Sequence, residues 1–332
     1  MGGSDKFSYF NEEEFKWSVK NDFQTREQKV LFEVANTTSK TILLVFDFDK
    51  TLSKIYMQDP LFEMNGIKAK EFWEDTKYIR EERRKKGHLS DGELEYINLI
   101  LEYANLGIIK DFSLKTLRDV GSKIVFFPGI PEFFQKLRED IEQDEIYKKY
   151  GIKIAYFVIS NGFAEVIRGT SIYPFLGDSE TNDEGVYANE FDEINGKLIL
   201  RYIMTKNKKT EALAKIIKKP YGEDDKIILE QKKHIFPNMI YFGDGKSDTP
   251  AFTMVRDKLG IPLAVFNPND EKSIYEARGL LKRNTVKYIS VADFSPESGT
   301  YVLIKSIVKE IADRIIYYIE KKNKPAMQGL SH

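Results

Sequence analysis

The chain has 332 residues, with 51 Lys and Arg against 52 Asp and Glu, three His and no Cys. Without Cys there is no disulfide, no Cys-ligated zinc or iron–sulfur site and no thiol nucleophile. A Ser-His-Asp triad would have to use His88 or His234, because His332 is the last residue. Carboxylates, lysines and hydroxyls remain, and the carboxylates suit hard, oxygen-seeking cations such as Mg²⁺.

The formal net charge of −1 predicts no bulk attraction to nucleic acid or to a membrane. The first residues, MGGSDK, lack the apolar segment of a signal peptide, and no apolar run approaches the about 20 residues of a membrane span. We therefore expect a cytoplasmic protein whose partner is a small molecule. The sequence leaves the oligomeric state open.

Apolar runs alternate with helical patterns along most of the chain. Spaced apolar positions in residues 8–36 predict one or two helices outside the core. Runs typical of buried parallel strands follow at 41–47, 152–160, 238–243, 261–266 and 286–291. Helical patterns lie between them at 130–141, 209–217, 249–258 and 272–277. The alternation predicts an α/β fold, a Rossmann-like parallel sheet with helices on both faces.

One gap interrupts this alternation. Charged helical patterns at 69–86 and 91–106 occupy the stretch between the first two strands. We interpret residues 54–123 as an inserted helical cap on an α/β core of residues 41–53 and 124–322. Residues 1–40 would form an N-terminal helical extension, 185–200 a small β-like insertion and 323–332 a frayed tail.

Polar residues follow three of the predicted strands. The first strand runs into Asp47 and Asp49, the second into Ser160 and Asn161, and the third into the segment GDGKSD, with Asp244 and Asp248. Ligands of open parallel sheets bind at the carboxyl ends of the strands, so these groups are expected to share one edge. Crowded carboxylates repel one another, and a divalent cation is the natural compensation.

Such a set suits phosphoryl transfer. One carboxylate can act as nucleophile, and a second can protonate the leaving oxygen and then activate water. A lysine at the start of the predicted 209–217 helix, Lys209 or its rival Lys208, can neutralise the phosphoryl group at the same edge.

The order DFDKT, SN, helix-opening Lys and GDGKSD resembles the haloacid dehalogenase-like (HAD) phosphohydrolases over residues 41 to about 291. The helical insertion resembles the cap of the phosphoserine-phosphatase-like branch. The resemblance implies that Asp47 is the nucleophile and Asp49 the general acid and base. It also implies Mg²⁺ bound by Asp47, the backbone carbonyl of Asp49 and Asp244, with Asp248 holding the metal's water shell or the lysine. The phosphate-binding residues would be Thr51, Ser160, Asn161 and Lys209.

The resemblance defines the reaction but not the substrate. That branch has a Glu after the first motif and an Arg in the cap, whereas here Tyr56 takes the first position and residues 87–98 contain no Arg. Tyr56, Gln58 and Asp59 are candidate substrate contacts. An aromatic, acid-rimmed pocket favours an amine, as in phosphocholine or phosphoethanolamine.

The predicted function is thus a Mg²⁺-dependent phosphatase that acts on a small phosphorylated metabolite through an aspartyl-phosphate. Two alternatives stay open: a phosphotransferase on the same scaffold, and a non-catalytic phosphate sensor or interaction protein. We also expect the cap to open and close over the site.

Overall fold

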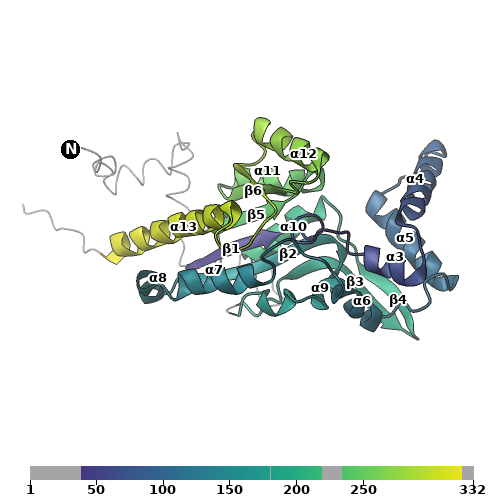
Figure 1. Ribbon diagram of the computed structural model, residues 1–332, viewed down its shortest axis with the longest axis horizontal. Coiled ribbons are helices and arrows are strands. Elements are labelled where there is room, and N and C mark those ends of the chain that lie inside the picture. The colour runs from purple at the N-terminus through teal and green to yellow at the C-terminus, as the bar shows by residue number, and fades with distance from the viewer. Residues whose placement is uncertain (1–38, 180, 219–233, 324–332) are drawn as a thin grey trace, which may run out of the picture.

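A single seven-stranded sheet organises the computed structural model, which describes residues 39–179, 181–218 and 234–323. The strand order is β4-β3-β2-β1-β5-β6-β7 (Figure 1). All neighbours are parallel except β3 and β4. The strands are β1 Thr41–Phe46, β2 Lys153–Phe163, β3 Val186–Ile194, β4 Lys197–Tyr202, β5 Met239–Gly243, β6 Ile261–Phe266 and β7 Tyr288–Val291. The helices expected within 8–36 lie outside the described residues.

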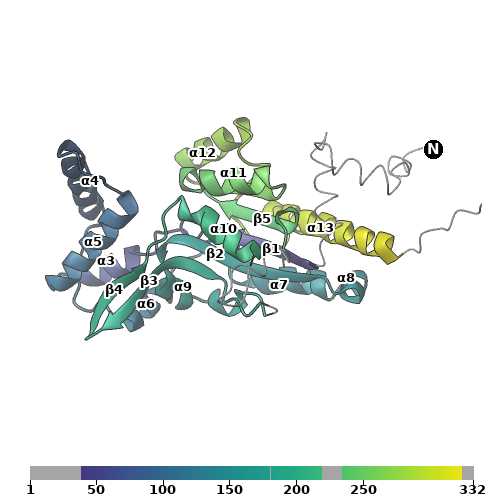
Figure 2. The ribbon, with the colours of Figure 1, turned by 180° about the vertical axis from the view of Figure 1, so that it is seen from behind.

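Helices cover both faces of this sheet, as Figures 1 and 2 show from opposite sides. Ile42, Leu44 and Phe46 of β1 face a core shared with α7 (Glu132–Glu142), α8 (Glu145–Tyr150), α9 (Ala164–Arg168) and α13 (Gly299–Asn323). Leu43 and Val45 face the opposite core, with α10 (Lys208–Lys218), α11 (Thr249–Asp257) and α12 (Glu271–Lys282). Successive strand residues point to opposite faces, so a continuously apolar β1 requires two covered faces. The predicted fold class is confirmed.

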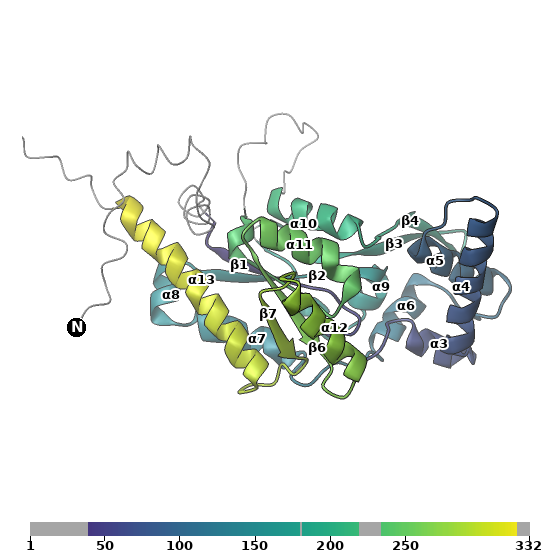
Figure 3. The ribbon, with the colours of Figure 1, turned by 90° about the horizontal axis from the view of Figure 1, so that it is seen from above.

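Four helices fill the inserted stretch: α3 Asp59–Asn65, α4 Ala69–Lys85, α5 Gly92–Asn105 and α6 Leu114–Gly121. α4 and α5 stand beyond the end of the sheet (Figure 3). α6 instead packs closely on α9. Gly121 permits this approach, because a Cβ at its position would lie 2.1 Å from the backbone oxygen of Val166. The prediction of several helices here, among them 69–86 and 91–106, is confirmed, whereas α8 and α9 of the core were not predicted. The domain boundaries stay a prediction.

The second strand differs from its prediction. It continues to Phe163 rather than ending at Ser160, and its pairing with β3 shifts register between Ile159 and Phe163. Ser160 and Asn161 therefore lie within the irregular end of β2 and not after it. Such bulges redirect side chains at sheet edges next to functional sites. α12 also extends beyond its predicted end, to Lys282, and β3 and β4 confirm the predicted β-like insertion.

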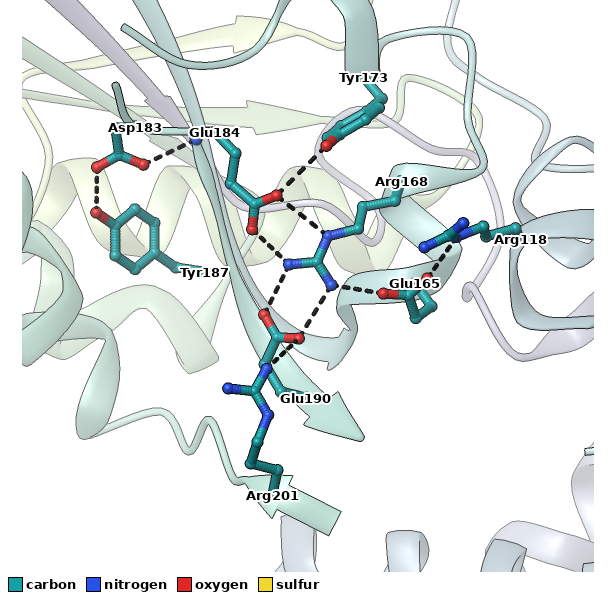
Figure 4. A network of polar contacts seen from close by, with 10 residues as sticks. Arg118, Glu165, Arg168, Tyr173, Asp183, Glu184, Tyr187, Glu190 and Arg201 are labelled. Atoms are coloured by element: carbon teal, nitrogen blue, oxygen red, sulfur yellow. Dashed lines mark hydrogen bonds and ion pairs between the residues drawn. The ribbon is translucent and has the colours of Figure 1, made fainter. Parts of the chain in front are cut away.

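An ion-pair network ties α9 to β3 (Figure 4). The mostly buried guanidinium of Arg168 contacts Glu165, Glu184 and Glu190, with Nη1 2.6 Å from Glu165 Oε1 and Nη2 2.9 Å from Glu190 Oε1. Arg118 of α6 reaches Glu165 at 2.6 Å, so the network also includes the inserted segment. Shared carboxylates make the network continuous, and it fixes the helix that directly follows the end of β2.

No helix among the described residues has the length and apolar character needed to cross a bilayer.

Candidate active site

The carboxyl ends of β1 and β5 bring three carboxylates together. Oxygen atoms of Asp47, Asp244 and Asp248 all lie within 4.8 Å of one another. The backbone places Asp47 there, since its N–H donates to the carbonyl of Phe242, the fourth residue of β5, at 2.8 Å. The hydroxyl of Thr51 donates to Asp47 Oδ2 at 3.2 Å. Predicted residues that are far apart in the sequence thus meet at one sheet edge.

Lys209, at the start of α10, completes this cluster. Its Nζ lies 2.5 Å from Asp47 Oδ1 and 2.7 Å from Asp248 Oδ1, and its side chain is 1% exposed. Asp248 Oδ1 also accepts a hydrogen bond from the hydroxyl of Tyr241 at 2.7 Å. The rival Lys208 points elsewhere, with Nζ 4.8 Å from the centroid of the Tyr202 ring. Lys209 is therefore the lysine that contacts the carboxylates.

The electrostatics of the cluster are unbalanced. Burial, reinforced by the charge of Asp248, raises the pKa of Asp47 to about 6 even though Lys209 acts in the opposite direction. Burial, followed by the charges of Asp248 and Asp47, raises the pKa of Asp244 well above its usual value. Burial alone would lower the pKa of Lys209, but Asp248 and Asp47 outweigh it and raise that pKa. One lysine does not balance three carboxylates, so a further positive charge would stabilise the cluster.

Asp49 lies two residues beyond Asp47, and its Oδ1 accepts the backbone N–H of Met57 at 2.9 Å. Burial, followed by the charge of Asp47, raises the pKa of Asp49 well above its usual value. A carboxyl group in this position holds its proton more tightly than an exposed aspartate, as a general acid requires.

The end of β2 is held by Ser160 and by two residues, Asn189 and Tyr96, that the motif pattern did not reveal. Ser160 is buried, and its Oγ accepts the N–H of Gly162 at 3.0 Å. The amide nitrogen of Asn189 in β3 donates to the backbone oxygens of Asn161, at 2.5 Å, and Gly162, at 2.9 Å. The hydroxyl of Tyr96 in α5 donates to the Asn161 oxygen at 2.6 Å. No local signal marks Asn189 or Tyr96, because their contacts cross long sequence separations.

The side chain of Asn161 makes a backbone contact. Its Nδ2 donates to the backbone oxygen of Met204 at 3.0 Å, just before α10. This contact connects the end of β2 to the segment that precedes Lys209.

The three candidate substrate contacts differ in how exposed they are. Tyr56 is 45% exposed, and Lys50 Nζ lies 4.6 Å from the centroid of its ring. Gln58 is buried, and Asp59 accepts the backbone N–H of Tyr56 at 3.0 Å. Asp59 thus shapes the turn before α3, and Tyr56 is the one of the three with a broadly accessible side chain.

His234 takes part in a separate contact. Its Nε2 lies 3.0 Å from Asp178 Oδ2, and its Nδ1 lies 3.3 Å from Ser39 Oγ. These three residues are at most 8% exposed, and Ser39 precedes the amino end of β1, at the opposite edge from the carboxylates. Because the contact lies at the opposite edge of the sheet from the carboxylates, it is separate from the candidate active site.

Comparison with known proteins gives distant likenesses. No family model matches the chain. An uncharacterized protein from Borreliella burgdorferi is 26% identical over 287 residues, which cover 80% of this chain and 96% of that protein.

Among solved structures, a phospho-aspartyl intermediate analogue of phosphoserine phosphatase is 21% identical, with a TM-score of 0.44 and coverage of 77% of this chain and 95% of that one. A HAD family hydrolase from Salmonella enterica serovar Typhi is 14% identical, with a TM-score of 0.46 and coverage of 85% and 77%. At these values the likenesses assign neither activity nor substrate to this chain.

Proposed function

We propose that the protein is a HAD-like, Mg²⁺-dependent phosphomonoester phosphatase that acts through an aspartyl-phosphate on Asp47. The observation that carries this proposal is the convergence of Asp47, Asp244 and Asp248 within 4.8 Å, with Lys209 Nζ against Asp47. The printed titles of similar structures, phosphoserine phosphatase and HAD family hydrolase, agree with it.

The residues present fit a divalent cation. Three carboxylate oxygens converge, and burial, reinforced by the charges of neighbouring aspartates, raises the pKa values of Asp47 and Asp244. A divalent cation with oxygen ligands would offset this crowding of carboxylates. Asp47, Asp244 and the backbone carbonyl of Asp49 would hold the ion. Asp248 Oδ1 already accepts from Lys209 and Tyr241, which favours an outer role for that residue. When bound, Mg²⁺ supplies charge stabilisation at the phosphoryl oxygens.

The chain's own groups carry the reaction. A carboxylate oxygen of Asp47 attacks phosphorus, the bond from phosphorus to the ester oxygen breaks, and Asp49 gives its proton to that oxygen. Asp49 then takes a proton from water, which attacks phosphorus and breaks the bond to Asp47. The raised pKa of Asp49 supports the first of its two roles. Lys209 and the Ser160 hydroxyl stabilise the phosphoryl oxygens.

Hydrolysis of a panel of phosphomonoesters by the full chain tests the function. We expect turnover with MgCl₂, loss of turnover in EDTA and recovery when Mg²⁺ is restored. Asp47→Asn removes the nucleophile at constant size and serves as the blank. Activity that persists in purified Asp47→Asn would overturn the proposal. Product analysis in the presence of added alcohols separates hydrolysis from phosphotransfer, the alternative on the same site.

A further inference from the structure

Met57 lies in the segment between β1 and α3, and it contacts two separate parts of the candidate active site. It is fully buried. Its backbone N–H donates to Asp49 Oδ1 at 2.9 Å. At the other end of the residue, Sδ accepts the backbone N–H of Phe163 at 2.8 Å. One residue thus joins the candidate acid to the last residue of β2.

The thioether of Met57 lies tightly against the end of β2. A Cβ at Gly162 would lie 2.1 Å from Sδ of Met57 and 2.3 Å from its Cε, so glycine leaves the room that this side chain occupies. Phe163 is 1% exposed, and a buried backbone N–H requires an acceptor. A methionine sulfur is a weak acceptor, whereas an aliphatic side chain of similar size has none. The contact therefore depends on the sulfur and not only on the volume of Met57.

The N–H of Met57 determines which oxygen of Asp49 can carry a proton. An oxygen that accepts an N–H is the carbonyl-type oxygen of a neutral carboxyl group, so a proton on this group is carried by Oδ2. In the first step proposed above, that proton passes to the ester oxygen as the bond from phosphorus to this oxygen breaks. A general acid must lie within hydrogen-bond reach of the atom that it protonates. The position of the Met57 N–H therefore affects where Asp49 delivers its proton.

We propose that Met57 is a positioning residue for protonation of the leaving group. Its thioether holds the residue against the end of β2, and its backbone N–H in turn holds Asp49. The distance between the acid and Ser160, three residues before Phe163, is fixed by this link. The inference rests on the proposed phosphatase function and concerns the first step of that reaction. Met57 acts through Asp49 and is assigned no contact with the substrate.

A matched pair of esters distinguishes this role from a general loss of structure. Para-nitrobenzyl phosphate releases an alcohol, whose oxygen must take up a proton as it leaves. Para-nitrophenyl phosphate has a similar shape but releases a stable phenolate, which leaves without one. For both esters kcat/KM includes only the steps through departure of the leaving group. It therefore reports Asp49 as an acid and excludes its later action on water.

Met57→Leu keeps the apolar volume and removes the acceptor, an exchange that buried sites tolerate well. We expect its kcat/KM to fall about tenfold to hundredfold for para-nitrobenzyl phosphate, part of the value of general acid catalysis, and less than about threefold for para-nitrophenyl phosphate. Met57→Gln supplies an oxygen acceptor on a side chain of similar length and should restore part of the loss. Met64→Leu is the matched control, since Met64 lies in α3 and is 46% exposed.

The ratio of the two kcat/KM values carries the test. A loss of the same size for both esters in Met57→Leu, or no loss for either, would overturn the inference. Equal values for para-nitrobenzyl phosphate in Met57→Leu and Met57→Gln would also overturn it, because the sulfur would then not act as an acceptor.

Hydrogen exchange of the full chain provides a readout that does not require catalysis. Peptides that contain residues 57 and 163 should exchange faster in Met57→Leu than in wild type, and at the wild-type rate in Met64→Leu. Faster exchange in Met57→Leu, with hydrolysis of neither ester by wild type, contradicts the phosphatase function alone. Hydrolysis of both esters by wild type, with unchanged exchange and an unchanged kcat/KM ratio in Met57→Leu, contradicts the positioning role alone.

Discussion

The hydroxyl of Tyr96 lies 2.6 Å from the backbone oxygen of Asn161 and donates a hydrogen bond to it. Tyr96 belongs to the inserted helices and Asn161 to the irregular end of β2, so this bond joins the insertion to the segment that carries Ser160. Asn189 donates to the same oxygen from β3. The position of a candidate phosphate-binding segment thus depends on two elements outside it.

Tyr96→Phe removes this bond and little volume. We expect kcat to fall about tenfold, equivalent to about 1.4 kcal/mol, because the end of β2 is held less firmly. Steady-state kinetics measure the change. Tyr103→Phe is the matched control, since its hydroxyl lies on the same helix and contacts the exposed Asp75 at 3.3 Å. Equal kcat values in Tyr96→Phe and wild type would contradict the positioning role.

Lys209→Met leaves Asp47 and Asp248 buried without their cation. We expect the free energy of unfolding in EDTA to fall by about 3–5 kcal/mol, the usual cost of breaking a buried ion pair from one side. Lys208→Met, at the preceding position, should cost less than about 1 kcal/mol, because Lys208 Nζ lies over the ring of Tyr202 and makes no contact with the carboxylates. Chemical denaturation measures the free energy of unfolding of both variants. Equal losses in the two would contradict the assignment of Lys209 alone to the carboxylate cluster.

The acid cluster predicts a pH dependence of stability. The pKa of Asp47 is raised from 3.8 to about 6, so between these values the folded protein holds a proton that the unfolded chain has lost. In EDTA, stability should therefore decrease as pH rises through this window, and the raised pKa values of Asp49 and Asp244 act in the same direction.

Added Mg²⁺ should reverse this trend, because metal binding requires the ionised carboxylates. We expect the increase in Tm caused by MgCl₂ to be larger at about pH 7.5 than at about pH 5. Differential scanning calorimetry at both pH values measures it. An increase of the same size at the two values would show that these carboxylates do not bind the ion.

The Arg168 network predicts a stability effect that depends on burial (Figure 4). Arg168→Gln leaves Glu165 and Glu190 without their central cation and should lower the free energy of unfolding by about 3 kcal/mol. Arg201→Gln removes an outer, half-exposed partner of Glu190 and should cost about 1 kcal/mol or less. Equilibrium unfolding compares the two variants, and a larger loss for Arg201→Gln would be inconsistent with the network as described.

The local sequence pattern was sufficient to predict the parallel sheet and the position of Asp47 at the end of its first strand. The run TILLVFD is apolar at every strand position, and β1 is buried on both faces. The sequence also contains the information needed to choose between Lys208 and Lys209. Lys209 has the helical spacing of the buried Ala212, Leu213 and Ile216, which places it on the face of α10 toward the sheet.

Other parts of the site depend on tertiary contacts that no local pattern contains. The Tyr96 and Asn189 contacts join residues 65 and 28 positions apart in the sequence. The extension of β2 to Phe163 likewise depends on its pairing with β3, where Phe163 faces Asn189.

Chemical trapping of the intermediate tests the central claim most directly. The full chain is mixed with MgCl₂ and a phosphomonoester that it hydrolyses, and the reaction is quenched in acid. Treatment with borohydride then reduces an acyl phosphate of aspartate to homoserine. Peptide mass spectrometry then locates the modified residue. The account predicts homoserine at position 47 in wild type and none in Asp47→Asn. Homoserine at another aspartate, or its absence from position 47 under conditions of steady turnover, would contradict an aspartyl-phosphate on Asp47.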